Sequence, residues 1–371
     1  MGDTPLHEVS RAIARATSDL GDRDLVLIAC SGGPDSLALA AASARLASRP
    51  GQPSFGAVVV DHQLQPGSGS VAERAAETCR SLGLAPVEVI AVSVVNRPGG
   101  AGPEAAARAA RLRALREAAR GHRAASVLLG HTLDDQAETV LLGLARGSGS
   151  RSLAGMSPID GLWRRPALGL RRDVLRAACA EAGIRPHWDP HNADPAYARS
   201  RVRTVVLPTL EAELGPGIAE ALARSADMMR ADADVLDRLA ADWLESHLPA
   251  VLGSTSGSAN DFANDSTARS VGDCPTSDRP EGAPQFEVPV PQLSTPPAAV
   301  RTRILRLISI AAGAPPGALT RDHILRIDQL ISAWRGQGAI ALPGQVVVER
   351  LGNRLAWGKE SGSAGQECRR K

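Results

Sequence analysis

The chain has 371 residues, of which 43% are hydrophobic and 22% charged, and its formal net charge is +2. This length exceeds what one hydrophobic core organises and predicts two or three folded units. The composition excludes a fibrous or globally disordered chain, and a nearly neutral chain does not by its bulk charge indicate a nucleic-acid partner. Nearly every cation is an arginine, because the only lysines are Lys359 and Lys371. Arginine suits phosphate contacts, although a bias in composition is the favoured explanation of the total.

The cysteines are scattered, with no CxxC pair and no spacing typical of a zinc site or a disulfide framework. Residues 1–20 lack an apolar signal-peptide core, and no run approaches the roughly 18 apolar residues of a membrane span. We therefore expect a cytoplasmic protein with no membrane association.

The N-terminal third alternates between helix and strand signals. Apolar positions at helical spacing over 9–20 predict an amphipathic helix, and the continuous apolar run over 25–30 predicts a central parallel strand. A glycine-rich turn and a helix over 36–47 follow. The pattern then continues with strands over 56–60, 87–95 and 126–130 and helices over 71–82 and 104–119.

This alternation predicts an α/β fold with a doubly wound, mostly parallel sheet. In such sheets ligands bind beyond the carboxyl ends of the strands, where the loops after Cys30, Val60 and Gly130 are expected to converge.

The remainder of the chain is predicted to be helical, then unstructured, then a small α+β unit. Residues 218–244 form a long helical pattern, and 252–285 is too poor in large apolar residues to order itself. Helices over 300–310 and 323–334 and a short hairpin near 345–348 complete the chain. The predicted domains are a catalytic domain over 1–208, a helical region over 209–251, a disordered linker over 252–285 and a C-terminal domain over 286–371.

The hexapeptide Ser31-Gly32-Gly33-Pro34-Asp35-Ser36 lies between the buried strand and its helix, where backbone N–H groups and the helix dipole bind anions. It lacks the Gly-Lys-Ser/Thr ending of a Walker A loop. Glycines let the backbone approach phosphates, the serine hydroxyls donate hydrogen bonds, and Asp35 can hold Mg²⁺ or orient the loop. A simple glycine-rich helix cap is the alternative.

A second segment, His131 to Thr139, places Asp135 and Glu138 three residues apart on one helix face. Such a pair can hold a divalent metal or receive an ammonium group. Acids that merely complement the helix dipole explain the spacing equally well.

The hexapeptide resembles the SGGxDS motif of the PP-loop ATP pyrophosphatases, which cleave ATP between its α and β phosphates and transfer AMP to a carbonyl. That superfamily includes GMP and asparagine synthetases, tRNA thiolation enzymes and tRNA lysidine synthetases. The motif therefore implies an adenine nucleotide α-hydrolase-like fold and adenylating chemistry, without fixing the substrate.

The run from His131 to Gly149, with Leu153-Ala154-Gly155-Met156, resembles the tRNA(Ile)-lysidine synthetase family. The similarity extends through 165–166 and 188–203, covers most of 20–230, and resumes more weakly in 297–306 and 334–344. The resemblance implies ATP-dependent adenylation of the C2 carbonyl of the wobble cytidine in a CAU anticodon. Free L-lysine then displaces AMP through its ε-amine.

The same resemblance implies roles for individual residues. Asp135 and Glu138 would handle Mg²⁺ and the lysine ammonium, and together with Asp35 and Arg108 they form the expected catalytic set. Arg108 and Arg111 match a family Ala-Arg-x-x-Arg-Tyr element, in which Leu112 here replaces the tyrosine; a solvated helix face is the alternative. The expected ATP-binding residues are Ser31, Gly32, Gly33, Pro34, Asp35, Ser36, Asp61, His62 and His131.

An arginine-rich stretch is expected to contact tRNA phosphates, although any one member could simply be solvated. Ser200 stands where the family has Asn. His187 and His191 are four residues apart, but the neighbouring prolines and the lack of a third ligand argue against zinc, so Mg²⁺ is the only metal expected. The expected tRNA-binding residues are Arg111, Arg164, Arg165, Arg171, Arg172, Arg199, Arg201 and Arg203.

Several rival functions are weighed against this one. A tRNA thiolation enzyme would need a catalytic cysteine pair or a cluster-binding CxxC, and a GMP synthetase would bring an amidotransferase unit. A non-catalytic RNA-binding protein would be expected to lose Asp35, Asp135 or Glu138, and all three are present. The sequence leaves a homodimer open.

Overall fold

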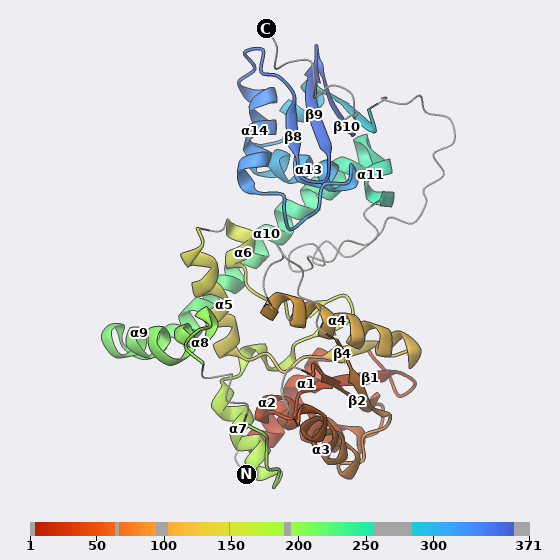
Figure 1. Cartoon of the computed structure of the whole chain (residues 1–371), viewed down its shortest axis with the longest axis vertical. Helices are drawn as coiled ribbons and strands as arrows, with labels where there is room; N and C mark the ends of the chain where they lie inside the picture. Colours follow the sequence, from red (N-terminus) through yellow and green to blue (C-terminus); the bar gives the residue numbers. More distant parts are fainter. Residues whose placement is uncertain are drawn as a thin grey trace. The chain divides into compact units, whose positions relative to one another are not determined.

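The computed structural model describes residues 4–63, 67–93, 103–147, 149–188, 194–254 and 284–359 (Figure 1). The chain divides into two compact units, 1–230 and 231–371, and the division falls inside the long helix α10 (Ile218–His247). Residues 255–283 of the predicted linker, and His191, lie outside the described residues. None of the described helices combines the length and apolar character needed to cross a membrane.

The first unit is built on a six-stranded sheet with the order β3-β2-β1-β4-β6-β5. All neighbouring pairs are parallel except β5 and β6, which are antiparallel. β1 is central because Leu25–Cys30 is apolar throughout and can be covered on both faces. The strands are β1 (Leu25–Cys30), β2 (Ser54–Asp61), β3 (Val87–Ala91), β4 (Ser126–Leu128), β5 (Ile159–Asp160) and β6 (Trp163–Arg164).

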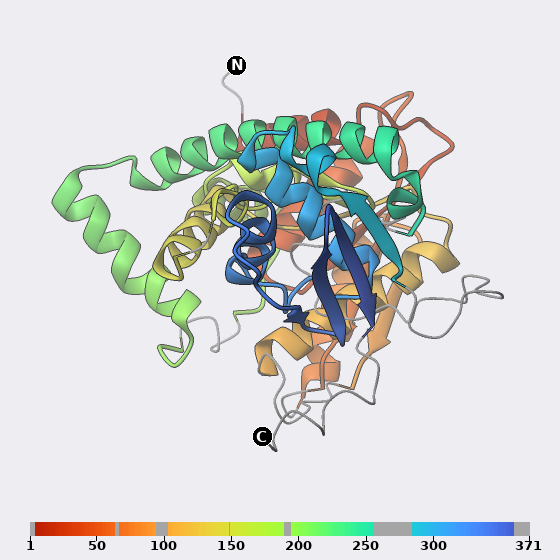
Figure 2. The ribbon, with the colours of Figure 1, turned by 90° about the horizontal axis from the view of Figure 1, so that it is seen from above.

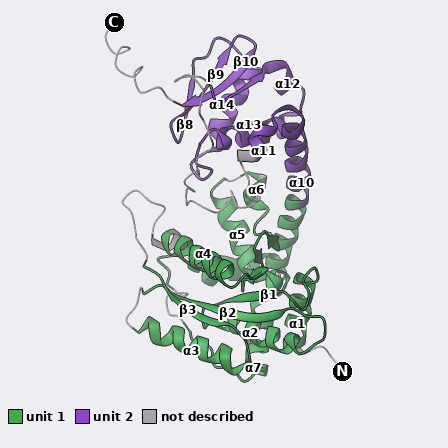
Figure 3. Cartoon of the chain, turned by 90° about the vertical axis from the view of Figure 1, so that its right-hand side faces the viewer, with its two compact units in different colours: residues 1–230 green, residues 231–371 purple. Residues whose placement is uncertain are grey.

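Helices cover both faces of this sheet, as Figure 3 shows. One face of the sheet is covered by a layer of four helices, against which Val26 and Ile28 of β1 pack. Leu27 faces the opposite side and packs with Leu115 of α4. This alternation confirms the doubly wound α/β fold. The four-helix layer is α1 (Pro5–Ala16), α2 (Pro34–Ala47), α3 (Ser68–Ser81) and α7 (Arg172–Glu181), and α4 (Pro103–Gly121) covers the other face.

The rest of the first unit is helical. Residues Leu133 and Ala137 of α5 pack with Val202 and Leu207, which begin a π-helical turn and the helix that follows it. These helices and turns are α5 (Leu133–Ala145), α6 (Ser150–Leu153), a 3-10 turn (Pro166–Gly169), α8 (Ala198–Arg201), the π-helical turn (Val202–Val206) and α9 (Leu207–Leu214).

The second unit contains an antiparallel sheet with the order β7-β10-β9-β8, beside which its helices lie (Figure 2). The hairpin expected near 345–348 is thus part of a larger sheet. Trp357 is fully buried and its indole N–H donates to the Ser309 hydroxyl at 3.1 Å. The elements are α11 (Pro249–Ser254), β7 (Phe286–Pro289), α12 (Val290–Ser294), α13 (Ala298–Ala311), α14 (Arg321–Ser332), β8 (Ile340–Leu342), β9 (Val346–Leu351) and β10 (Arg354–Lys359).

Candidate active site

The predicted phosphate loop begins directly after β1 and ends in the first turn of α2. Gly32 has φ of +76°, a conformation that side chains disfavour. The Ser31 N–H donates to the Ser36 hydroxyl at 3.1 Å, and that hydroxyl donates to the Gly33 carbonyl at 3.0 Å. No side chain caps α2, so its first-turn N–H groups remain available to an anion.

Three loops meet at this edge of the sheet, as expected from the strand order. β2 and β4 flank β1 in parallel register, so the loops that follow all three strands leave the sheet on the same side. A Cβ on Gly130 would lie 3.4 Å from the backbone of Asp35 and Ser36, which shows how closely the β4 loop approaches the phosphate loop. A further segment joins them, because the His187 N–H donates to the Gly32 carbonyl at 2.9 Å.

Two histidines of the predicted nucleotide site lie on the converging loops. Burial lowers the pKa of His62, and the nearby Arg111 lowers it further. Burial also lowers the pKa of His131 well below its ordinary value. Within the described residues, neither ring has a hydrogen-bond partner at its Nδ1 atom. Asp61 at the end of β2 is buried and accepts the Gln63 N–H at 2.9 Å.

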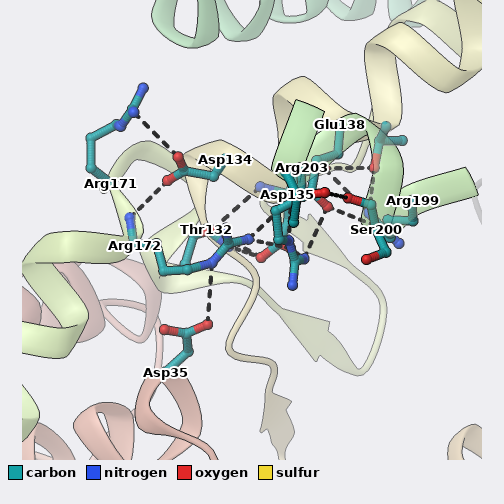
Figure 4. Close-up of polar contacts among 12 residues, drawn as sticks. Asp35, Thr132, Asp134, Asp135, Glu138, Arg171, Arg172, Arg199, Ser200 and Arg203 are labelled. Carbon is teal, nitrogen blue, oxygen red and sulfur yellow. Dashed lines mark hydrogen bonds and ion pairs between the residues drawn. The ribbon is translucent and has the colours of Figure 1, made fainter. Parts of the chain in front are cut away.

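Asp135 and Glu138 lie on the first turns of α5, and Arg172 links them to Asp35 of the phosphate loop (Figure 4). The Asp135 Oδ2 accepts both the N–H and the hydroxyl of Thr132 at 2.9 Å, which closes a capping box at the start of the helix. The Oδ1 atom is left for other partners. Burial alone would raise the pKa of Asp135, but Arg172, His131 and the Thr132 backbone together hold it below its ordinary value.

Three arginines bind these two carboxylates. The Arg172 NH2 group lies 3.0 Å from Asp135 Oδ1 and 3.2 Å from Glu138 Oε1. Arg203 donates to the same two acids, and Arg199 Nε donates to Glu138 Oε2 at 2.9 Å. Glu138 is fully buried, so it depends on these partners for compensation.

Arg172 also reaches the phosphate loop, with its Nε 3.7 Å from Asp35 Oδ2. We call the resulting group the acid–arginine cluster; it consists of Asp35, Asp135, Glu138, Arg172, Arg199 and Arg203. Burial, assisted by the charge of Asp135 and opposed by that of Arg172, raises the pKa of Asp35 to about 6. Asp35 Oδ1 is buried and has no hydrogen-bond partner among the described residues.

Arg111 is a cation for which the described part of the chain supplies no compensating partner. It is half-buried on α4, and no described residue forms a hydrogen bond or an ion pair with it. Burial, together with the like charges of Arg108 and Arg199, lowers its pKa to about 10. An unpaired guanidinium among like charges is a strong site for an anion.

The other predicted tRNA-binding arginines have partners within the protein. Arg164 is buried and pairs with Asp19, and Arg165 is buried and donates to the Ser157 carbonyl at 2.7 Å. Burial lowers the pKa of Arg165 to about 10. Arg171 pairs with the side chains of Asp134, Glu211 and Glu220.

Arg201 differs from the buried members of that set. Its side chain is exposed and donates to the Pro195 and Ala196 carbonyls at 2.6 and 2.9 Å. With Arg172, Arg199 and Arg203 held on the acids, the predicted basic cluster is largely neutralised from within. Sequence reasoning missed this, because the pairing depends on contacts between residues more than 30 positions apart.

A cavity of about 160 Å³ adjoins the acid–arginine cluster. Glu138, Arg172 and Arg203 line it together with Asp134 and Arg171. Within the described part of the chain no group of three or more His, Cys, Asp or Glu side chains could hold a metal by itself. A metal here would need ligands from a bound substrate.

Both units of the chain match known protein families. Residues 5–210 match the PP-loop domain, and residues 289–355 match the TilS substrate binding domain. The tRNA(Ile)-lysidine synthase of Thermobifida fusca (strain YX) is 48% identical over 92% of this chain and 93% of its own. The corresponding Streptomyces coelicolor protein is 50% identical over 89% of this chain and 84% of its own.

A solved structure agrees on the fold. The U34-tRNA thiolase NcsA from Methanococcus maripaludis, solved with its [4Fe-4S] cluster, superimposes with a TM-score of 0.51 over 61% of this chain and 79% of that one. At 18% identity this likeness concerns architecture alone. The match to the PP-loop domain establishes ATP binding. Because the sequence identity with these two synthases is 48% and 50% over most of both chains, the chain belongs to the tRNA(Ile)-lysidine synthase family.

Proposed function

We propose that this chain is an active tRNA(Ile)-lysidine synthase, which adenylates the wobble cytidine of a CAU anticodon and then joins lysine to it. The observation that carries the proposal is the meeting of the phosphate loop with the acid–arginine cluster, where Arg172 contacts both Asp35 and the Asp135–Glu138 pair. That arrangement places a nucleotide site beside carboxylates suited to an ammonium group.

ATP would bind with its phosphates on the open N-terminus of α2. The first-turn N–H groups lie beside Ser31, whose hydroxyl is 3.3 Å from that of Ser36. Asp61 ends β2, and His62 and His131 follow β2 and β4. Mg²⁺ fits here because the buried Asp35 Oδ1 has no partner among the described residues and Mg²⁺ favours one or two carboxylates plus phosphate oxygens. The ion would neutralise phosphate charge.

In the first step the cytidine C2 carbonyl oxygen would bond to the α phosphorus while the bond to the β phosphate breaks, releasing diphosphate. Negative charge develops on the transferring group. Arg111, which has no counter-ion among the described residues, and Arg108 beside it would stabilise that charge. The two arginines gain importance because Leu112 cannot supply the hydroxyl of the family's tyrosine.

In the second step the lysine ε-amine, after losing a proton to solvent, would form the C–N bond at C2 while the C–O bond breaks and the former C2 oxygen leaves with AMP. Asp135 Oδ1 and Glu138 would receive the ammonium. The cavity of about 160 Å³ beside them is the proposed entry for lysine. Arg164 and Arg165 are buried, and each donates to a partner within the protein, so we do not assign them to tRNA. Exposed Arg201 remains a candidate phosphate contact.

The second unit would help to seat the tRNA, as its match to the TilS substrate binding domain suggests. Trp334 is 38% exposed, and the Arg350 guanidinium lies 5.2 Å from its ring centre. A partly exposed ring that carries a guanidinium on one face would suit stacking with an unpaired base.

The test incubates the purified protein with Mg-ATP, labelled lysine and a tRNA(Ile) transcript with a CAU anticodon, following AMP and label in the RNA. A transcript with U34 in place of C34 is the matched control. Release of AMP with labelling of the CAU transcript alone supports the proposal. Release of AMP without label would instead indicate a different PP-loop modification, such as thiolation, and absence of both products would contradict catalysis.

A further inference from the structure

The acid–arginine cluster is electrically balanced before any substrate arrives. It contains three carboxylates and three guanidinium groups, and every oxygen of Asp135 and Glu138 already accepts a hydrogen bond. A lysine ammonium placed on these acids would add a fourth cation to a buried site. Such an excess charge is unfavourable in a poorly solvated environment, so one arginine must leave when lysine binds.

Arg172 is the arginine best placed to leave. Arg199 and Arg203 hold Glu138 through three short contacts of 2.7 to 3.0 Å, whereas Arg172 reaches the same residue at 3.2 Å. Arg172 also contacts Asp35, which is a residue of the phosphate loop. Its guanidinium therefore already lies beside the site where phosphates would bind.

The backbone of Arg172 is fixed while its side chain has alternatives. Its N–H donates to Asp134 Oδ2 at 2.7 Å, which anchors the first residue of α7. A change in side-chain torsions alone can then exchange carboxylate partners for phosphate oxygens, which a planar guanidinium binds in the same forked manner. Both Arg172 and Glu138 line the adjoining cavity, so this movement would expose the acid to it.

We propose that Arg172 is a displaceable counter-ion that covers the ammonium site on Asp135 and Glu138 until ATP phosphates on the loop attract it away. This inference rests on the proposed function, because it assumes that lysine binds these acids. ATP binding thereby opens the lysine site, and free amines do not occupy the acids in an enzyme that has no nucleotide. Arg172 acts as a positioning residue.

The test is calorimetric titration of L-lysine into the full chain, alone and saturated with Mg²⁺ and α,β-methylene-ATP, whose α–β bridge cannot be cleaved. In the wild type we expect lysine to bind at least about tenfold more tightly with the analogue present, and linkage requires lysine to tighten analogue binding by the same factor. In Arg172→Gln the ratio should fall to about one, because lysine gains affinity for the nucleotide-free protein.

A purely structural role for Arg172 would weaken both titrations and leave their ratio unchanged, which would overturn the proposal. Arg185→Gln, which removes an exposed arginine after α7, should keep the wild-type ratio. If Arg172→Gln does not fold, Arg172→Lys decides. A single ammonium nitrogen cannot take the places of both the Nε atom at Asp35 and the NH2 group at Asp135 and Glu138, so the ratio should fall below that of wild type. If the wild type binds lysine with the same affinity with and without the analogue, the coupling is refuted but the proposed function is not. If the wild type binds no lysine in either state, the proposed function is refuted as well.

Discussion

The Asp134 Oδ2 atom accepts the backbone N–H of Arg172 at 2.7 Å, so the first turn of α5 caps the first residue of α7. Asp134 immediately precedes Asp135, and one turn of helix therefore supplies both the cap of the neighbouring helix and an acid of the candidate site. The position of α7 relative to the acids depends on this contact.

Replacing Asp134 with Ala should lower the free energy of unfolding by about 1 kcal/mol, as expected for the loss of a helix cap. Asp134→Asn keeps an acceptor and should lose less. Urea denaturation of the two variants makes the comparison. If both variants lose the same free energy of unfolding, Asp134 stabilises the fold through its charge and not through its hydrogen bond to Arg172.

Asp135→Asn should abolish lysine transfer without unfolding the protein. The amide oxygen can still accept from Thr132 and preserve the capping box, but the charge that would receive the ammonium is gone. We expect label incorporation to fall by at least about 100-fold. Asp232→Asn, which alters an exposed acid on α10, is the control. Nearly normal turnover in Asp135→Asn would refute its assigned role.

Glu138→Ala should destabilise the protein far more than removal of a surface acid. Glu138 is fully buried beneath three arginines, and its loss leaves their charges uncompensated, at a cost of about 3–5 kcal/mol. Glu73 also pairs with an arginine but is 61% exposed, so Glu73→Ala should cost no more than about 1 kcal/mol. Thermal or urea unfolding would measure both, and similar losses would contradict the importance of burial.

Asp35→Asn should remove activity while stabilising the fold at neutral pH. Burial raises the pKa of Asp35 to about 6, so its neutral form is favoured in the folded protein. The free energy of unfolding of the wild type therefore falls as pH rises from about 4 to about 6, and the variant lacks this fall. The variant should gain on the order of 1–3 kcal/mol at pH 7.5 and almost nothing at pH 4.

Urea titrations at the two pH values test this gain, with Asp22→Asn at an exposed position as the control. A gain of the same size at both pH values would show that the titration of Asp35 is not its source. Loss of ATP consumption in the same variant would show that the loop carries a charge required for function at the expense of stability.

The first half of the fold follows from local sequence patterns. The apolar runs that became β1 and β2 and the glycine-rich turn between β1 and α2 were predictable because each depends on neighbouring residues. The strands β5 and β6 have two residues each and are too short to show an alternation of apolar and polar residues. The helix α7 contains few large apolar residues. The sequence therefore did not indicate these three elements. β7 pairs with β10, nearly 70 residues away in sequence, which no local pattern indicates.

The candidate site was predictable in its members but not in its pairings. Asp135 and Glu138 were expected to face the cleft from their spacing, and Arg172, Arg199 and Arg203 were expected to contact RNA from their charge. The structure places all five together. Charge in a sequence indicates that a partner is needed, whereas the identity of that partner is decided by tertiary contacts.

The hydrogen bond from the His187 N–H to the Gly32 carbonyl fixes the chain after α7, just as Asp134 fixes the residue where α7 begins. The sixteen positions from 172 to 187 therefore have to span a set separation. In an enzyme that keeps both contacts, the length of this stretch is therefore constrained. An insertion or deletion there would displace Arg172 or the backbone of the phosphate loop. It would therefore disturb the nucleotide site more than the hydrophobic core.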